Sequence, residues 1–538
     1  MDRNLKKKYK DVFTERMNTS IFFERKNLER CIDKMDYSLH TKIASPLSEI
    51  FLRDMKIKKR SKYKDIYEIL NEINNEMKSG KDHILYQYYQ EKYGDLGLST
   101  NILIPYLDIY DLKKGKPPEI KELIVISHEE DCDRIAVAHV NKMPNFKPIL
   151  LDSIISTTDK KHWKSQRNDY VEAFDPFESL KKIIPISQSR ARKCSNLLWK
   201  KSIQGRRMVN MNDFFLNETQ AQLQLSMFGV SNEFQEETNK KIRDAFGGSG
   251  KKGYTREFAF KLIDELNLPN RKVGPLGEVI RDRIPKTDTE KYGNSLIYAF
   301  AGHDTTGHTL TWLLFELCKN INLQKELQQE VDTFWLKKRD GDEITFSDFK
   351  KLPFMTKCIM ETLRLWPAVP NGTFRKLVSD DFIRGIGGNK VKLKKGTYVQ
   401  IFNWSKHRNP KLWGDDVNIF NPHRIFDEDE IWGNQNFYGF QNPSSARFSP
   451  FTYPPRDCIG KNFAQLEMRL MLLYLLRDYT FVLTNKQLLN AMDDNYLGSN
   501  RATLGPVDVY NTININDKGL RPYHLGMYCN VISRHSKL

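Results

Sequence analysis

The sequence predicts a mainly α-helical protein with a small β region. Residues 160 to 365 form successive amphipathic patterns of helical period, separated by Gly, Pro and Asn-Gly breakers. The segment LKKGTYVQIFNW then alternates and is rich in aromatic and β-branched residues, which predicts a pair of strands. Two turn-rich segments follow, NPKLWGDDVNIFNPHRIF and GFQNPSSARFSPFTYPPRD. They predict long ordered loops, which commonly hold a ligand.

The N-terminal part differs in composition from the rest. Residues 1–84 are predicted to be a basic helical extension, with the runs KKKYK and MKIKKRSKYK as a solvated face, and residues 85–538 the main domain. The chain contains no apolar stretch long enough for a signal peptide or a membrane span. We therefore expect an intracellular protein, cytoplasmic or in peripheral contact with a membrane, without a transmembrane anchor.

Charge and cysteine content narrow the class of protein. The chain has 85 Lys and Arg against 68 Asp and Glu, a net charge of +17, so its surface should attract acidic partners. Its seven cysteines are scattered, odd in number and without a CxxC pair. This pattern argues against a disulfide framework and against a structural zinc site.

One cysteine lies directly before a hydrophobic helix. The run FTYPPRDCIG contains Arg456, Cys458 and Gly460, and the helix KNFAQLEMRLMLLYLL follows. These residues, with Phe451, resemble the haem-binding signature of the cytochrome P450 superfamily. The resemblance implies a mainly α P450 fold and haem b, with Cys458 as the axial thiolate ligand of the iron. The helix dipole would stabilise the thiolate, and Arg456 would reach a haem propionate.

The cysteine loop departs from the family at one position. The family usually has glycine where this chain has Pro454, and Pro454 and Pro455 cannot adopt a positive φ. Gly460, by contrast, is present and would let the backbone pass close to the haem. The resemblance therefore does not fix the shape of the loop before Cys458.

Other motifs of the family occur in the expected order. Trp163 and Arg167 resemble a WxxxR motif, and Arg375 resembles a further arginine of the family, so all three are expected to bind haem propionates. Glu361-Thr-Leu-Arg364 resembles the ExxR motif. The resemblance implies that Arg424 completes a buried Glu-Arg-Arg cluster of structural importance, although His423 and Ile425 stand where the family usually has Glu and Phe.

A hydrophobic helix carries polar residues at its centre. The segment SLIYAFAGHDTTGHTLTWLLFELC predicts a buried helix, in which Asp304 and Thr305 are costly unless they have a role. The stretch AGHDTT resembles the oxygen-activating motif of the family, which implies that Asp304 and Thr305 are catalytic and deliver protons. Gly302 would leave room for dioxygen. His303 and His308 are five residues apart, which is wrong for two ligands on one helical face.

The resemblance also implies substrate, partners and reaction. Candidate pocket residues are Ile297, Tyr298, Ala301 and Val369, which favour a small apolar substrate such as a lipid, sterol or xenobiotic. The implied reaction inserts one atom of dioxygen into that substrate. The chain has no glycine-rich dinucleotide fingerprint, so NAD(P)H would act indirectly, through a separate flavoprotein reductase or a ferredoxin.

Three alternatives stay open at this point. A P450-fold isomerase or dehydratase would need no external electrons, but such enzymes tend to lack the acid-alcohol pair. A non-catalytic haem-binding sensor would follow if the Pro454 loop did not support turnover. A nucleic-acid or membrane binder would depend chiefly on the basic extension, and we expect no nucleic-acid partner.

Overall fold

The computed structural model describes most of the chain from residue 59 onward, with gaps. The residues described are 29–30, 33, 37–40, 42–47, 59–79, 82–93, 101–108, 119–174, 177–229, 260–261, 263–427, 430, 445–484 and 527–535. Most of the predicted N-terminal extension before residue 59 and the turn-rich residues 431–444 therefore lie outside the described part.

The fold is mainly α-helical, as predicted. The longer helices are α4 (Lys59–Ser79), α5 (Asp82–Tyr93), α6 (Glu129–Ala138), α8 (Lys160–Phe174), α9 (Phe177–Gln204), α10 (Met211–Phe228), α13 (Pro275–Arg281), α14 (Asp288–Lys319), α15 (Ile321–Trp335), α17 (Pro353–Leu365) and α21 (Lys461–Asp478). The shorter helices are η2 (Tyr37–Leu39), η5 (Pro144–Phe146), α7 (Lys147–Leu150), α16 (Phe346–Phe349), η6 (Ile386–Gly388), α18 (Asn403–His407) and α19 (Pro410–Trp413). None of the described helices is long and apolar enough to cross a membrane.

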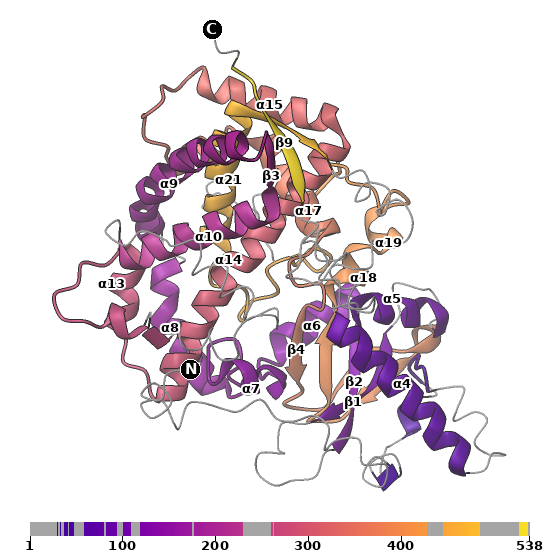
Figure 1. Cartoon of the computed structure of the whole chain (residues 1–538). Coiled ribbons are helices and arrows are strands. Elements are labelled where there is room, and N and C mark those ends of the chain that lie inside the picture. Colours follow the sequence, from indigo (N-terminus) through magenta and orange to yellow (C-terminus); the bar gives the residue numbers. More distant parts are fainter. Residues whose placement is uncertain are drawn as a thin grey trace, which may run out of the picture.

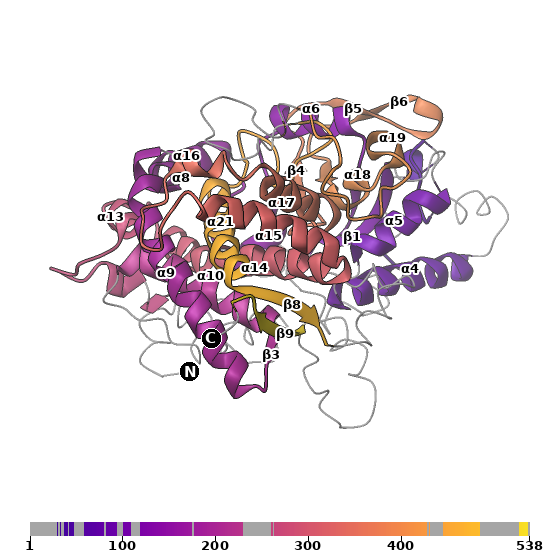
Figure 2. The same cartoon turned by 90° about the horizontal axis from the view of Figure 1, so that it is seen from above.

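The strands form three small sheets. They are β1 (Ile102–Asp108), β2 (Glu119–Ile126), β3 (Met208–Asn210), β4 (Thr373–Lys376), β5 (Asp381–Arg384), β6 (Lys390–Leu393), β7 (Tyr398–Ile401), β8 (Tyr479–Leu483) and β9 (Tyr528–Ser533). The strand orders are β1-β2-β7-β4, β3-β9-β8 and β5-β6. Figures 1 and 2 show the first sheet beside α4 and α5 at one end of the molecule, and the long helices α9, α10, α14 and α21 at the other.

The strand pair predicted within LKKGTYVQIFNW is wrong in its partners. Both β6 and β7 are strands, but β6 pairs with β5, whereas β7 pairs in parallel with β2 and antiparallel with β4. Between them Gly396 has φ 93°, and its N–H donates to the carbonyl of Leu377 rather than closing a hairpin. The turn thus directs the chain from one sheet into another.

The helix α14 runs through the core and is buried along most of its length. Thr287 caps its N-terminus by accepting a hydrogen bond from the Glu290 N–H at 3.1 Å. Two glycines let α10 pack closely on it: a Cβ at Gly302 would lie 2.1 Å from Leu223, and one at Gly307 would lie 2.8 Å from Leu216. These contacts set the position of the central turn of α14.

The helix α4 packs against α5, and α5 packs against β1 of the first sheet. Ile66 and Ile73 on α4 are buried, and on α5 the Tyr86 ring lies edge-on to Phe402. The predicted boundary between residues 84 and 85 falls inside α5. A division of the chain there stays a prediction.

Candidate active site

The loop that carries Cys458 ends at the first turn of α21. The Cys458 N–H donates to the carbonyl of Phe451 at 2.9 Å, and Gly460 stands at the N-cap of α21. The Cys458 side chain is accessible, yet desolvation by the surrounding protein raises its pKa. That combination is expected of a thiol that faces an internal space rather than the outer surface. A Cβ at Gly460 would likewise meet no atom within 4 Å.

Several groups oppose the effect of burial on this thiol. A hydrogen bond from the Gly460 backbone and the charges of Arg167 and Lys461 lower the pKa of Cys458, while Asp457 raises it. Both cations are themselves bound to Asp457: Arg167 Nη2 donates to Asp457 Oδ1 at 2.9 Å, and Lys461 Nζ to Oδ2 at 2.6 Å. The dipole of α21 adds to their effect. These groups partly offset the effect of burial, and the pKa of Cys458 remains raised.

The residues before Cys458 have an irregular backbone. The peptide between Pro454 and Pro455 is cis. The positive φ of the loop falls on Thr452, at 61°, where a residue other than glycine carries a cost of about 1 kcal/mol or more. Tyr453 is fully buried. The loop thus reaches Cys458 without a glycine at position 454.

One turn of α14 is accessible in a helix that is otherwise buried. From Tyr292 to Leu317 every residue is buried except Phe300, Ala301, Gly302, Asp304 and Thr305. Phe300 was not among the predicted pocket residues, although its hydrophobic ring next to Ala301 was a usable signal. These partly exposed residues follow one another closely along the helix.

The acid and the alcohol of this turn differ in their hydrogen bonds. Thr305 Oγ1 donates to the carbonyl of Ala301 at 3.0 Å. Asp304 Oδ1 lies 3.7 Å from Nδ1 of His308, and Asp304 Oδ2 has no hydrogen-bond partner. A carboxylate with a free oxygen beside a hydroxyl is suited to pass a proton. His303 Nδ1 lies 2.8 Å from the carbonyl oxygen of Ala299.

The role expected for Gly302 is wrong. The space left by its missing side chain is filled by Leu223 of α10, whose Cδ2 would lie 2.1 Å from an added Cβ. Gly302 therefore serves helix packing rather than leaving room for dioxygen.

The predicted cationic residues do not all converge. Arg167 binds Asp457, as described above. Arg456 donates to three backbone carbonyls, those of Val140, Ile154 and Thr157, each at 3.0 Å. Its guanidinium carbon lies 4.9 Å from the centre of the buried Trp163 ring. Arg456 thus ties the cysteine loop to the segment before α8.

Arg375 on β4 is placed differently. It is fully buried, and its Nε and Nη2 atoms have no hydrogen-bond partner, while Nη1 donates to Thr373 Oγ1 at 2.8 Å. Burial alone lowers its pKa to about 10. A buried guanidinium with unused donors is costly unless an anion binds it.

A further cation, Lys142, lies near Arg375 and Arg456 and was not predicted from the sequence. After desolvation, the charges of Arg456 and Arg375 lower the pKa of Lys142 well below its usual value. In the described part of the chain no ion pair joins Lys142, Arg375 or Arg456 to an acidic side chain. Arg375 has unused donors and Lys142 lies near it, so these two cations fit the propionates of a haem, whose iron Cys458 would bind. The only local signal for Lys142 was its charge.

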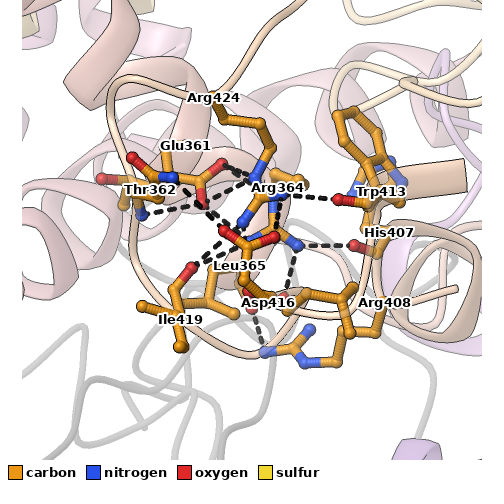
Figure 3. A network of polar contacts seen from close by, with 12 residues as sticks. Glu361, Thr362, Arg364, Leu365, His407, Arg408, Trp413, Asp416, Ile419 and Arg424 are labelled. Atoms are coloured by element: carbon orange, nitrogen blue, oxygen red, sulfur yellow. Dashed lines mark hydrogen bonds and ion pairs between the residues drawn. The ribbon is translucent and has the colours of Figure 1, made fainter. Parts of the chain in front are cut away.

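The predicted Glu361, Arg364 and Arg424 meet in a buried cluster. Arg364 donates to the Glu361 carboxylate from Nε at 2.7 Å and from Nη2 at 2.8 Å. Arg424 Nε lies 3.2 and 3.3 Å from the same two oxygens. Figure 3 shows both arginines directed at Glu361.

The cluster also reaches the irregular segment after α19. Arg364 Nη1 donates to the carbonyls of His407 and Val417, both at 2.8 Å, and Arg424 Nη1 donates to Asp416 Oδ1 at 2.7 Å. The cluster thus attaches α17 to the segment that leads toward the cysteine loop.

The candidate pocket residues lie in different surroundings. Ile297 is buried, and the Tyr298 ring packs against Tyr170 and Phe174 of α8. Tyr298 also lines a small cavity with Leu223 and other residues of α10. Only Ala301 belongs to the accessible turn of α14.

Val369 lies in the turn between α17 and β4 and is 41% exposed. The structure does not bring these four residues together as one lining. Their roles as pocket residues stay predictions.

Comparison with known proteins identifies a related family. Residues 282–503 match the sequence profile of the family described as Cytochrome P450. The chain is 33% identical over 195 residues to "Putative cytochrome P450 CYP13A5" of Caenorhabditis elegans, and the aligned residues cover 36% of this chain and 34% of that protein. It is 30% identical over 264 residues to "Putative cytochrome P450 CYP13A4" of the same organism, 47% of each chain. "Cytochrome P450 4F8" of Homo sapiens is 36% identical over 175 residues, 32% of this chain and 30% of that protein. The matches thus span about a third to a half of these relatives.

Proposed function

Because the chain belongs to the cytochrome P450 superfamily, we propose that it is a haem-thiolate monooxygenase that acts on a small apolar substrate. The family implies haem with a cysteine thiolate as axial ligand. When bound, the haem supplies oxygen activation, which thiolate ligation favours. The observation that carries the proposal is the combination of an accessible Cys458 thiol within the protein and the fully buried Arg375 with unused donors.

The chain's own residues would bind and orient the cofactor. Cys458 would hold the iron from the α21 side. Arg375 would donate to a propionate through Nε and Nη2, with Lys142 as a second donor. Arg456 is already bound to three carbonyls, so we assign it chiefly to holding the cysteine loop against the segment before α8.

The accessible turn of α14 would move protons. Asp304 has one free carboxylate oxygen, which can take a proton from solvent and pass it on. The Thr305 hydroxyl donates its hydrogen bond to the Ala301 carbonyl, so the lone pairs of Oγ1 remain available to accept a hydrogen bond from another group. The apolar Phe300 and Ala301 on the same turn would exclude water and favour an apolar substrate.

Electrons would come from a separate flavoprotein reductase or a ferredoxin. The net charge of +17 would steer an acidic partner toward the protein. If this is correct, the reduction rate should fall as ionic strength rises, because salt screens charges separated by more than about 10 Å at 0.1 M. An unchanged rate at high salt would argue against electrostatic docking.

The ligand is tested by the carbon monoxide difference spectrum of the dithionite-reduced protein. A thiolate-ligated haem gives a long-wavelength Soret band, and we expect this band to disappear in Cys458→Ser. Cys318→Ser is the matched control, since it removes a partly buried thiol elsewhere, and it should keep the band. A haem-loaded protein without the band would contradict the proposal and favour a non-catalytic haem-binding sensor.

The reaction is tested at Thr305. Thr305→Ala should reduce product formed per electron consumed on the order of 10²-fold, the usual contribution of positioned proton transfer. Thr311→Ala is the matched control: Thr311 makes the same bond to the carbonyl four residues earlier, at 2.8 Å, but is fully buried. Equal effects in both variants, or turnover without an electron donor, would favour the isomerase or dehydratase alternative.

A further inference from the structure

The loop that carries Cys458 is attached to α18 by a buried lysine. Lys406 on α18 is fully buried, and its Nζ donates to both Ser449 Oγ and Tyr453 Oη. Nζ also lies 4.5 Å from the centre of the Tyr453 ring. The Tyr453 hydroxyl in turn donates to the carbonyl of Ala446 at 2.7 Å. One ammonium group thus joins two points of the loop, Ser449 and Tyr453, to a helix.

Neighbouring residues of α18 hold the same loop. Asn403 Nδ2 donates to the Ser449 carbonyl at 3.2 Å, and the Ser449 hydroxyl donates to Asn403 Oδ1 at 3.1 Å. The Ser449 N–H donates to His407 Nε2 at 3.2 Å. Ser449 is therefore bound to α18 through its main chain and its side chain.

The helix α18 is itself fixed to the rest of the fold. At its start the N–H of Phe402 donates to the Ile126 carbonyl of β2 at 2.8 Å, and the N–H of Trp404 to the Pro370 carbonyl at 3.0 Å. The Trp404 side chain is buried. Lys406 therefore holds the loop from a rigid support.

The loop needs such an attachment because its own backbone provides little. Pro454 and Pro455 have no N–H to donate, and Thr452 has a positive φ of 61°. In this stretch the Thr452 N–H donates to the Ser449 carbonyl at 3.0 Å, and the Cys458 N–H donates to the Phe451 carbonyl at 2.9 Å. Tyr453, which lies between them, is held by its side chain.

The lysine is also costly where it lies. No ion pair with an acidic side chain is found for Lys406 within the residues that the structure describes, and burial lowers its pKa to about 8. A buried ammonium group that is bound only by hydroxyls is unfavourable unless it has a positional role. Burial of a methionine at this position would avoid that cost.

We propose that Lys406 and Tyr453 are positioning residues that hold the Cys458 loop in the geometry for thiolate ligation. In this loop the path from Ser449 to Cys458 is set by a side-chain anchor rather than by backbone hydrogen bonds or by a residue with a flexible backbone. The inference rests on the proposed function in one respect, namely that Cys458 is the haem ligand.

The test compares Lys406→Met and Tyr453→Phe with the unaltered full chain. Tyr453→Phe removes only the hydroxyl and keeps the ring in the core, so it remains informative if Lys406→Met folds poorly. Arg190→Met is the control, because it breaks a partly buried pair with Glu218, at 2.7 Å, between α9 and α10. Two readouts are used: the carbon monoxide spectrum and amide hydrogen exchange of the loop.

Both loop variants should convert part of the thiolate-type band to the thiol-type band while the far-UV spectrum is unchanged. Exchange at Thr452 and Cys458 should become about tenfold faster or more, the factor expected from losing one hydrogen bond to a charged group. Because the two groups act on one loop, the double variant should add little to either single one. Arg190→Met should change neither readout.

The outcomes separate this inference from the proposed function. Loop variants with the unaltered band and unaltered exchange would overturn the inference while the proposed function stood. An unaltered chain without a thiolate band would overturn the proposed function, whereas faster loop exchange in the variants would still support the anchor. Effects of the two substitutions that simply add would also argue against a shared anchor.

Discussion

Arg375 should have opposite effects on stability in the two forms of the protein. Without haem, the guanidinium is buried with unused Nε and Nη2 donors. With haem, the same donors would bind a propionate. Arg375→Met should therefore stabilise the haem-free protein and weaken the retention of haem.

The magnitude follows from the burial of the charge. Desolvation lowers the pKa of Arg375 from 12.5 to about 10, which at about 1.36 kcal/mol per pH unit corresponds to roughly 3 kcal/mol. Arg375→Met removes that cost, so the free energy of unfolding of the haem-free protein should rise by up to about 3 kcal/mol. Losing a hydrogen bond to a charged group costs about 1.5 to 3 kcal/mol, which should speed haem loss roughly ten- to a hundredfold.

Two assays measure these effects. Urea unfolding of protein expressed without a haem supply gives the first, and the rate of haem transfer to an excess of a high-affinity acceptor gives the second. Lys376→Met is the control, because Lys376 is the next cation on β4 but is exposed. The reasoning is refuted if Arg375→Met destabilises the haem-free protein, or if it loses haem no faster than Lys376→Met does.

Three further predictions concern the core. Glu361→Gln leaves the two arginines of its cluster without a counter-charge and should lower the free energy of unfolding by about 3 to 5 kcal/mol in urea titration; a change below about 1 kcal/mol would contradict this. Gly302→Ala should destabilise the protein by about 1 to 3 kcal/mol, and Leu223→Ala should partly restore stability in the double variant; no restoration would mean that the clash lies elsewhere. Burial depresses the pKa of Lys406 in the folded state to about 8. The unfolded chain therefore binds more protons than the folded chain from about pH 8 to 10.5, and the free energy of unfolding should rise with pH across that window. Lys406→Met should flatten this rise in urea titrations at stepped pH.

Three acidic groups near Lys406 favour its protonated form, namely Asp133, Glu129 and Glu430. Cys132 also lies close to it, but burial raises the pKa of Cys132 to about 12, so this thiol is neutral across the window. The pH dependence is therefore read as the difference between Lys406→Met and the unaltered protein, in which the contributions of these groups largely cancel.

The helices and the motif residues could be predicted because their signals are local. A period of 3.6 residues and a polar pair in an apolar segment can be recognised within a few turns, as for Asp304 and Thr305 of α14. The meeting of Glu361 with Arg424 followed only from the family resemblance, since neither residue signals its partner locally.

The buried orientation of the Arg375 side chain could not be predicted from a local sequence pattern. On β4 the buried face carries Thr373 and Arg375, while Phe374 is half-buried and Lys376 exposed. The usual rule that apolar residues face inward gives the opposite orientation. Lys142 was missed for a related reason, because its two cationic neighbours come from segments far along the chain.

Glycine roles and strand partners failed because they depend on the neighbouring element. Gly302 lies in a motif that the family associates with oxygen, yet Leu223 of α10 occupies the space beside it. Likewise the alternation of Lys390–Leu393 and Tyr398–Ile401 predicts two strands but cannot say that they join different sheets.

The parallel pairing of β2 with β7 has a consequence for synthesis of the chain on the ribosome. Leu123 pairs with Tyr398, about 275 residues later. At about 5 to 20 residues per second, β2 would wait roughly 15 to 55 s for this partner after it emerges. One edge of β2 can pair with β1 at once, but the other edge of β2, whose last residues Leu123–Ile126 are apolar, stays open during that time. The nascent chain therefore passes through a period in which it is prone to aggregate, and its yield should depend on chaperones that cover this edge.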